Sequence, residues 1–327
     1  MESNKYTIKK YDKTDFKIWN DFIAQAKNAT FLFHRDFMEY HQDRFKDYSL
    51  MVFEGEKLVA VLPANRVEDT VYSHQGLTYG SLVYRETLKL SCVIDVFKSI
   101  LCFLNENAIQ KLQLKLIPII YHQKPAEEIN YTLFLANARL IRRDSLSVLD
   151  LSQKNKISKI RKRGIQKAVA NQLIIKEEND FELFWNEILI PNLSKKHNAV
   201  PVHSLEEINS LKKFFPKNIR QFNVYKEGTI VGGTTIFETS TTAHCQYISK
   251  NEKEENLGSL DFLFQYLIEE KFAKKRFFDF GISNENQGKH LNKGLSYWKE
   301  SFGASTIVHD FYEVETSNYS LLNNVLI

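Results

Sequence analysis

A histidine lies in the second half of the chain, on a short stretch whose residues alternate as in a β-strand. Over residues 243–247, alternation places His244 and Gln246 on one face and Cys245 and Tyr247 on the other. One of these pairs should face water or a ligand. A histidine there can accept a proton near neutral pH, and a purely structural role is the alternative. Cys245 is a weaker candidate nucleophile, because no paired histidine and acid pattern accompanies it.

A carboxylate, Asp279, stands at the end of a second predicted strand. Residues 277–280 form an aromatic run that stops at Gly281, where a turn residue ends the strand. The loop that follows is polar and includes Ser283 and Asn284. Asp279 is the carboxylate that we would choose first as a general base or as an anchor for a substrate. The alternative is that it caps the amides of the loop.

An amphipathic helix is predicted over residues 291–302. Its apolar residues recur at the spacing of one helical face, and Gly303 ends it. They are Leu291, Leu295, Trp298 and Phe302. Tyr297 lies on the same helix, and its simplest role is to pack at the edge of that face.

The length of the chain fits two domains, each able to bury a core. Of its 327 residues, 26% are charged and 43% are apolar, as in a soluble globular protein. The formal net charge of +4 is too small to indicate nucleic-acid binding by itself. We place the boundary near Asp150, with one domain over residues 1–150 and another over residues 151–327.

Cysteine usage and the apolar stretches predict a cytoplasmic protein. The three cysteines have no Cys-x-x-Cys pair and no metal-ligand spacing, so we expect free thiols and no metal. The first residues are polar, unlike those of a signal peptide. The most apolar stretch, residues 92–104, contains Asp95 and Lys98 and is too short to span a membrane.

Periodicity predicts the other elements. In the first half we expect helices over residues 15–27, 35–44 and 86–105, strands over 48–53, 57–65 and 111–116, and an extended, glycine-interrupted segment over 71–84. In the second half we expect helices over 181–193, 204–215 and 260–271, and strands over 219–225, 230–239 and 242–249. Ser204 and Glu207 have the spacing of a capping box. His74 and Tyr79 lie on the glycine-interrupted segment, where a binding groove could use them.

Residues 154–171 form a predicted helix that is rich in lysine and arginine. Its basic residues are Lys154, Lys156, Lys159, Arg161, Lys162, Arg163 and Lys167. One interpretation is a solvated helix that joins two domains. The other is that the bases bind a phosphate-bearing ligand, because positive charges gathered on a helix concentrate polyanions.

Two short motifs resemble the C-terminal part of a GNAT-fold acyltransferase, particularly the FemAB-like branch, which carries two such domains in tandem. DFG at residues 279–281 and YWKESFGA at residues 297–304 are similar to that branch's strand and to its helix with a Lys-x-x-Phe-Gly pattern. Ser301 departs from the family, which usually has glycine just before that phenylalanine. The order of predicted elements in each half is similar to a GNAT domain. The resemblance implies an α/β fold (α+β, mixed sheet) with two tandem GNAT-like domains.

The resemblance also implies an N-acyltransferase that holds an acyl-CoA thioester beside an amine, with no covalent nucleophile. Such chemistry requires oriented donors for the developing oxyanion and a titratable group near the attacking nitrogen. Tyr297 lies five residues before Phe302, where many GNAT enzymes carry an acid tyrosine, and Asp279 and His244 complete the expected catalytic set. The expected donor-binding residues are Tyr247, Ile248, Ser249, Gly258, Ser259 and Asn284, and the expected substrate-binding residues are His74, Tyr79, Gln246, Ser283, Arg161 and Arg163.

The donor loop departs from the acetyl-CoA enzymes of the family. Those enzymes usually carry a glycine-rich loop whose amides hold the pyrophosphate. Here residues 250–259 contain one glycine, Gly258, and three acids, Glu252, Glu254 and Glu255, which would repel a pyrophosphate. FemAB-like proteins also lack that loop, and some of them take an aminoacyl group from tRNA. The sequence therefore leaves the donor open.

Three functions are consistent with the resemblance. The first is transfer of an acyl group, such as acetyl, from a CoA thioester to a small-molecule amine on a sugar-nucleotide or cell-envelope precursor. In that hypothesis the second domain carries the active site and the first contributes to acceptor binding. The second is an aminoacyl-tRNA-dependent peptidyl transferase of the FemX type. The third is a non-catalytic binding module that keeps the fold.

Overall fold

The computed structural model describes residues 5–251 and 256–327, which form two compact units. Unit 1 consists of Met1–Asp144 together with Val308–Ile327, and unit 2 consists of Ser145–Ile307. The last segment thus folds with unit 1, whereas the sequence placed it in the second domain. The reason is that strand β16 (Ser305–Glu315) pairs with a strand of unit 1.

Unit 1 combines helices with two groups of strands. Its strands are β1 (Tyr6–Lys10), β2 (Leu50–Glu54), β3 (Lys57–Leu62), β4 (Asn65–Val67), β5 (Thr70–Tyr72), β6 (Val83–Tyr84) and β7 (Lys111–Lys115). Its helices are α1 (Phe16–Ile23), α2 (Arg35–Met38), α3 (Leu90–Glu106) and α4 (Glu128–Leu135). In the strand order β1-β2-β3-β6, all neighbouring strands are antiparallel. In the strand order β4-β5-β7-β16, β5 and β7 are parallel and the other neighbours are antiparallel. The core of the unit includes Leu50, Phe97 and Leu112.

Unit 2 is built on a mixed sheet. Its strands are β8 (Arg139–Asp150, which crosses the boundary between the units), β9 (Ile174–Glu178), β10 (Ile219–Lys226), β11 (Thr229–Glu238), β12 (Thr242–Lys250), β13 (Phe277–Ile282) and the hairpin of β14 (Asn284–Glu285) and β15 (His290–Leu291). The order is β8-β13-β12-β11-β10-β9, and β12 and β13 are its parallel neighbours. The helices are α5 (Lys159–Ala170), α6 (Ile190–His197), α7 (Leu205–Phe214), α8 (Ser259–Tyr266) and α9 (Lys293–Glu300), with π-helical turns over Phe184–Leu189 and Leu267–Lys271.

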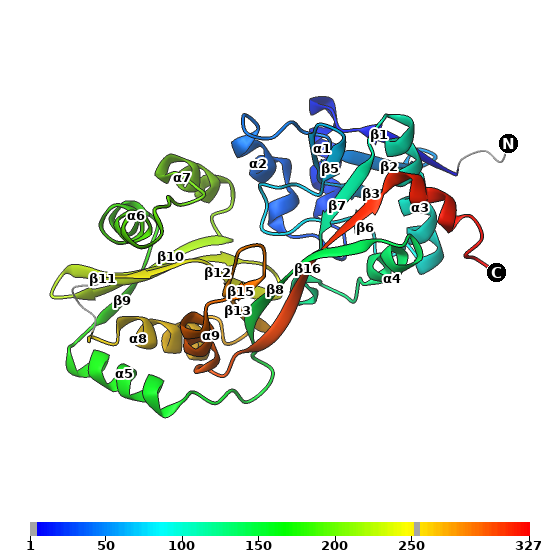
Figure 1. Cartoon of the computed structure of the whole chain (residues 1–327). Coiled ribbons are helices and arrows are strands. Elements are labelled where there is room, and N and C mark those ends of the chain that lie inside the picture. The colour runs from blue at the N-terminus through cyan, green and yellow to red at the C-terminus, as the bar shows by residue number, and fades with distance from the viewer. Residues whose placement is uncertain (1–4, 252–255) are drawn as a thin grey trace. The chain divides into compact units, whose positions relative to one another are not determined.

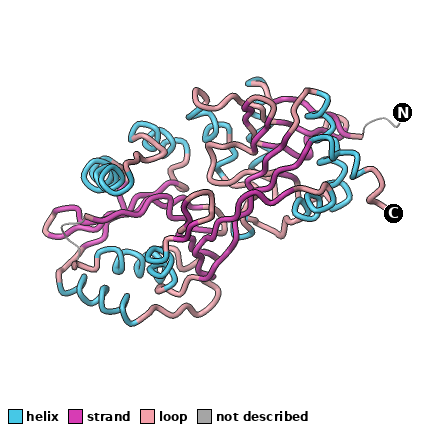
Figure 2. The backbone as a smooth tube through the Cα atoms, viewed as in Figure 1, coloured by secondary structure: helices cyan, strands magenta, loops and turns pink. Residues whose placement is uncertain are grey.

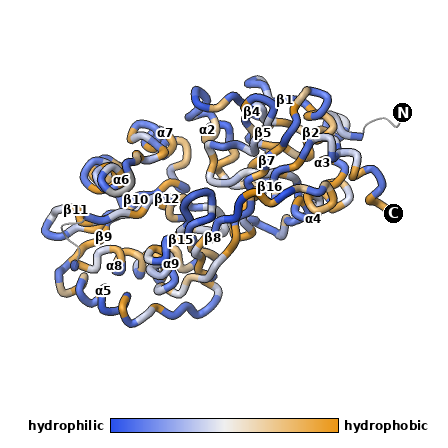
Figure 3. Tube along the Cα trace, viewed as in Figure 1, coloured by the Kyte–Doolittle hydropathy of each residue, from blue (hydrophilic) through white to orange (hydrophobic). Residues whose placement is uncertain are grey.

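Helices cover both faces of the unit 2 sheet. On one face α8 packs against β10 and β11, and α5 packs against α8 (Figure 1). On the other face lie α6 and α7, and the same layers are visible when the chain is coloured by secondary structure (Figure 2). Figure 3 shows α5 as mainly hydrophilic, in agreement with its lysines and arginines. The basic helix is therefore an outer layer over α8.

Local patterns account for most of these elements. Ser204 and Glu207 form the predicted capping box at the start of α7. Prediction of a helix from Leu291 was wrong, because Asn292 caps the helix and Leu291 pairs in the β14–β15 hairpin. In the glycine-interrupted segment, a Cβ atom on Gly80 would overlap the backbone oxygen of Ser73, so this position requires glycine.

Candidate active site

The parallel strands β12 and β13 are hydrogen-bonded over only part of their length. They pair at Thr242 with Phe277, at Ala243 with Phe278 and at His244 with Asp279. Beyond this point the described residues form no further pair between them, although β12 continues to Lys250 and β13 to Ile282. Backbone groups on the facing edges of both strands are thus left outside the parallel ladder. Such a gap can accept a carbonyl group from a ligand.

A β-bulge lies at the same place in β12. Tyr247 pairs with Thr235 of β11 and Cys245 pairs with Ile236, so Gln246 is the extra residue. The bulge breaks the alternation that grouped His244 with Gln246 in the sequence. Bulges often occur beside active sites, where they redirect a side chain.

His244 and Asp279 form a buried pair at the last paired position of the two strands. His244 Nδ1 lies 2.9 Å from Asp279 Oδ2, and the backbone N–H of Gly281 donates to Asp279 Oδ1 at 2.7 Å. Asp279 is fully buried and His244 is 8% exposed. Nδ1 is the donor in this pair if the carboxylate is ionised, and the basic lone pair of the imidazole then lies on Nε2. This arrangement can orient a general base.

Lys299 is a third ionisable residue near this pair, and the sequence analysis did not select it. It is 2% exposed, and Nζ donates to the backbone oxygens of Gly281 at 3.0 Å and Ile282 at 2.6 Å. Burial lowers the pKa of Lys299 to about 8, and the negative charge of Asp279 opposes that shift. A cation held beside the diverging strands can stabilise negative charge in a reaction. The Lys-x-x-Phe-Gly motif contains this lysine, so the motif was the signal that could have identified it.

A cavity of about 760 Å³ lies along the far end of β12. Ile248 and Ser249 of β12 line it, together with Leu295 and Trp298 of α9 and the start of α8 at Gly258 and Ser259. Its basic lining residues are Arg161, Arg163 and Lys167 of α5 and Lys250 of β12. Asp261 is the acidic residue among the lining residues that the structure describes, so these residues have a positive balance and suit an anionic ligand.

The helix α5 is packed directly onto the first turn of α8. A Cβ atom on Gly258 would overlap the backbone oxygen of Gly164, and one on Gly164 would overlap the carboxylate of Asp261. Arg161 Nη1 donates to Asp261 Oδ1 at 2.6 Å, so one basic residue of the cavity is already engaged within the protein. Burial raises the pKa of Asp261, and Arg161 opposes that shift. Arg163 and Lys167 are exposed and remain the main positive groups for a ligand.

The structure therefore brings together six of the predicted binding residues. Ile248, Ser249, Gly258, Ser259, Arg161 and Arg163 all line the same cavity. The sequence analysis missed Asn192, whose Nδ2 donates to Ser249 Oγ at 2.7 Å. Glu252, Glu254 and Glu255, the three acids that we expect to repel a pyrophosphate, lie outside the described residues.

Other predicted residues of unit 2 have different surroundings. The hydroxyl of Tyr247 lies 2.7 Å from Nδ1 of His203. Tyr247 is partly buried, and desolvation raises its pKa to about 12. Asn284 accepts hydrogen bonds from the backbone and side chain of Ser145, and Ser283 is buried. Gln246 is partly buried. Tyr297 is 56% exposed on α9 and does not line the cavity, so its role as an acid stays a prediction.

His74 and Tyr79 belong to unit 1 and are both buried. The Tyr79 hydroxyl donates to Thr30 Oγ1 at 3.1 Å, and His74 lines a smaller cavity in that unit. Within residues 5–251 and 256–327, no group of histidine, cysteine, aspartate and glutamate side chains is arranged to hold a metal ion. A search of the same residues for a helix with the length and hydropathy of a membrane span found none.

Comparisons with known proteins show the fold. No protein-family model matches the chain, and no curated protein matches its sequence. The crystal structure of FemX is similar, with a TM-score of 0.65 and 9% identity over 96% of this chain and 99% of that one. A tandem GNAT protein from the clavulanic acid biosynthesis pathway has a TM-score of 0.52 and 10% identity over 95% of this chain and 98% of that one. The C-terminal domain of a putative lysylphosphatidylglycerol synthetase from Agrobacterium fabrum has a TM-score of 0.56 and 12% identity over 81% of this chain and 84% of that one.

The class that these similarities define is the tandem GNAT-like fold, in agreement with the resemblance of the two sequence motifs. Within that class the chain is similar in fold to FemX along nearly its whole length.

Proposed function

We propose that unit 2 catalyses the transfer of an acyl group from a phosphate-bearing donor to a primary amine. The observation that carries the proposal is the divergence of β12 and β13 immediately after the His244–Asp279 pair. The gap offers backbone groups of β12 that lie outside the parallel ladder to a carbonyl, and the pair offers a base for the amine. The basic cavity at the far end of β12 supplies charge for the phosphates of the donor.

In the proposed reaction the amine nitrogen forms a bond to the acyl carbon. His244 takes a proton from that nitrogen, with Asp279 holding the imidazole in place. Backbone amides of β12 and the ammonium group of Lys299 stabilise the oxyanion. The bond between the acyl carbon and the donor then breaks, and the leaving sulfur or oxygen takes a proton, for which Tyr297 is the predicted acid.

An acyl-CoA, such as acetyl-CoA, is the first proposed donor. Its phosphates would lie against Arg163 and Lys167, and its thioester would lie in the gap beyond His244. We propose a cytoplasmic amine on a sugar-nucleotide or cell-envelope precursor as the acceptor, as the sequence resemblance implies.

Aminoacyl-tRNA is the second proposed donor, and one contact favours it. Because Gly164 of α5 sits against Gly258, the first turn of α8 is partly covered, and this turn is where a pyrophosphate would otherwise bind. The same contact leaves the basic side of α5 exposed, where a larger polyanion can bind. FemX-type enzymes use aminoacyl-tRNA, which is consistent with this alternative.

The test is a donor panel assayed for loss of the acyl group. Purified protein is incubated with several acyl-CoA thioesters, with a mixture of aminoacyl-tRNAs and with amine acceptors, and free thiol or free tRNA is measured. We expect turnover with one donor class, and loss of that turnover in His244→Gln. Donor binding without turnover, unchanged by His244→Gln and Asp279→Asn, would instead support the non-catalytic module.

A further inference from the structure

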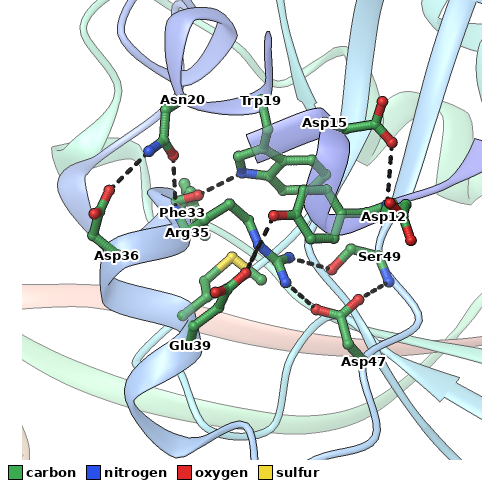
Figure 4. Close-up of polar contacts among 12 residues, drawn as sticks. Asp12, Asp15, Trp19, Asn20, Phe33, Arg35, Asp36, Glu39, Asp47 and Ser49 are labelled. Carbon is green, nitrogen blue, oxygen red and sulfur yellow. Dashed lines mark hydrogen bonds and ion pairs between the residues drawn. The ribbon is translucent and has the colours of Figure 1, made fainter. Parts of the chain in front are cut away.

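Unit 1 contains a cavity of about 300 Å³ that the proposed acyl transfer does not use. Arg35, which is 3% exposed, is one of its lining residues. Nη2 of Arg35 donates to Asp47 Oδ2 at 2.5 Å, and Nε donates to Glu39 Oε1 at 3.1 Å. Figure 4 shows the guanidinium group between these carboxylates and the hydroxyl of Ser49. Arg35 is thus fixed in position and largely neutralised before any ligand arrives.

His74 forms part of the cavity wall in a conformation that suggests a function. Its φ is +55°, a left-handed value that costs a residue other than glycine about 1 to 3 kcal/mol. The side chain is 3% exposed, and its Nδ1 has no hydrogen-bond partner among the described residues. Leaving a buried polar atom unsatisfied is costly, so strain and a missing partner coincide at one residue. Nδ1 itself is covered, so a ligand would meet His74 through the part of the ring that lines the cavity.

The imidazole of His74 is neutral across the physiological range. Burial lowers its pKa to about 3, and the neighbouring His41, Arg35 and Lys115 add to the shift. Its ring is stacked on His41 and tilted against Phe45, with centroid distances of 5.0 and 5.4 Å. A neutral imidazole has one donor and one acceptor, so it suits a hydroxyl group, which can fill either role.

The positive and negative charges of the lining residues are equal in number. The cavity has three carboxylates and three cationic groups, and Gln42 and His74 add neutral donors and acceptors. The carboxylates are Asp12, Glu39 and Asp47, and the cations are Lys13, Arg35 and Lys46. Met38 and Phe45 supply apolar surface. A phosphate or a free carboxylate would be attracted by three of these groups and repelled by the other three, whereas an uncharged polar molecule can hydrogen-bond to both kinds of group.

From these observations we infer that the unit 1 cavity binds an uncharged, hydroxyl-rich small molecule of about the size of one hexopyranose ring. The hydroxyls pair with the charged side chains and with His74, and the C–H face of the ring packs on Phe45 and Met38. The volume of about 300 Å³ is at the lower end of the range for small-molecule sites. This inference concerns unit 1 and does not depend on acyl transfer.

The test is ligand-detected NMR together with calorimetry on the full chain. The probes are glucose, N-acetylglucosamine and myo-inositol, with inorganic phosphate and glycine as charged comparisons. We expect millimolar or tighter binding of at least one hydroxyl-rich probe and none of the charged ones. His74→Phe, which keeps the ring stacking and removes both nitrogens, and Gln42→Ala, an exposed change that spares the core, should each weaken binding at least tenfold.

Two matched variants serve as controls. His122→Phe alters another histidine of unit 1 that has a buried Nδ1 and a pKa lowered by burial to about 4, but it does not line the cavity. Asp43→Asn changes the exposed neighbour of Gln42, which also lies outside the lining. Both should bind the probe normally. Failure of every hydroxyl-rich probe, preference for phosphate or glycine, or equal binding by Gln42→Ala and the parent protein would overturn the inference.

Discussion

At the scale of single residues, the proposed chemistry depends on the pairing of His244 with Asp279. A sequence can show that a histidine lies on one strand and an aspartate on another, but not that the strands are parallel neighbours in this register. The bulge at Gln246 could not be predicted from the sequence either, because it depends on pairing with β11. Lys299 was overlooked because it lies next to Trp298 on an amphipathic helix, where the pattern alone predicts an exposed lysine. Its burial follows from contact with the end of β13.

His244→Gln should reduce the turnover number about 10²- to 10⁴-fold, the usual contribution of a general base. The Michaelis constant should change little, because the cavity that holds the donor is intact. Steady-state kinetics with the active donor measures both quantities. His290→Gln changes an exposed histidine on β15 and should leave the kinetics unchanged. An equal effect of the two substitutions would contradict a role for His244 in proton transfer.

Lys299→Met should alter the dependence of stability on pH. The pKa of Lys299 is about 8 in the folded chain and about 10.5 in its ordinary state, so the unfolded chain binds more protons between these values. Wild-type stability therefore rises through this pH window, relative to the methionine variant, by up to roughly 3 kcal/mol. Denaturant unfolding of both proteins at several pH values measures the difference. A constant difference across the window would show that folding does not lower the pKa of Lys299.

At the scale of elements, α5 is the basic helix for which the sequence left two interpretations open, and ligand binding by its basic residues stays a prediction. It is packed against α8 through Gly164, and it also presents Arg163 and Lys167 to the cavity. The sequence predicted its charge and approximate extent, but not that α8 would lie beneath it. That packing joins residues about a hundred positions apart in the chain, such as Arg161 and Asp261.

Arg163→Ala and Lys167→Ala should each weaken binding of the phosphate-bearing donor about tenfold, because each removes a charged hydrogen-bond donor. The effect should diminish at high salt, where the attraction between charges is screened. Lys162→Ala changes an exposed lysine of the same helix that does not line the cavity, and it should bind the donor normally. Calorimetric titration at two salt concentrations makes the comparison. Equal weakening by all three variants would mean that only the overall charge of α5 matters.

Gly258→Ala should destabilise unit 2 more than Gly228→Ala does. Both glycines have positive φ values, +74° and +82°, so alanine at either site costs about 1 to 2 kcal/mol in backbone strain. At Gly258 the added Cβ atom also overlaps the backbone oxygen of Gly164, whereas at Gly228 nothing lies within 4 Å. Urea unfolding should show an additional loss of about 1 to 3 kcal/mol at Gly258. Equal losses would mean that α5 does not press on α8.

At the scale of the whole molecule, chain length predicted two compact parts. The class of fold was predicted from the resemblance of two short motifs and from the order of the elements. The sequence did not predict that residues after 307 return to the first part. β16 pairs with β7, and Val314 and Leu322 enter the core of unit 1. Such a return depends on pairing between segments about two hundred residues apart, which a local pattern cannot reveal.

Removal of Val308–Ile327 should therefore unfold unit 1. The truncated unit loses the partner strand of β7 and the hydrogen bond from Thr316 Oγ1 to the Ile109 oxygen at 2.6 Å. Hydrogen exchange should show lost amide protection in β7 and α3. Removal of residues 323–327 alone spares Leu322 and should leave that protection in place. Full protection of β7 in the longer truncation would contradict the assignment of this segment to unit 1.

The central claim is that a reactive acyl carbonyl lies in the gap between β12 and β13. The most direct measurement is a crystal structure with a non-reactive amide analogue of whichever donor supports turnover. The account predicts that the analogue's carbonyl oxygen accepts a hydrogen bond from a β12 amide beyond His244, with the phosphates beside Arg163. An analogue that binds with its carbonyl elsewhere, leaving the gap between the two strands empty, would contradict it.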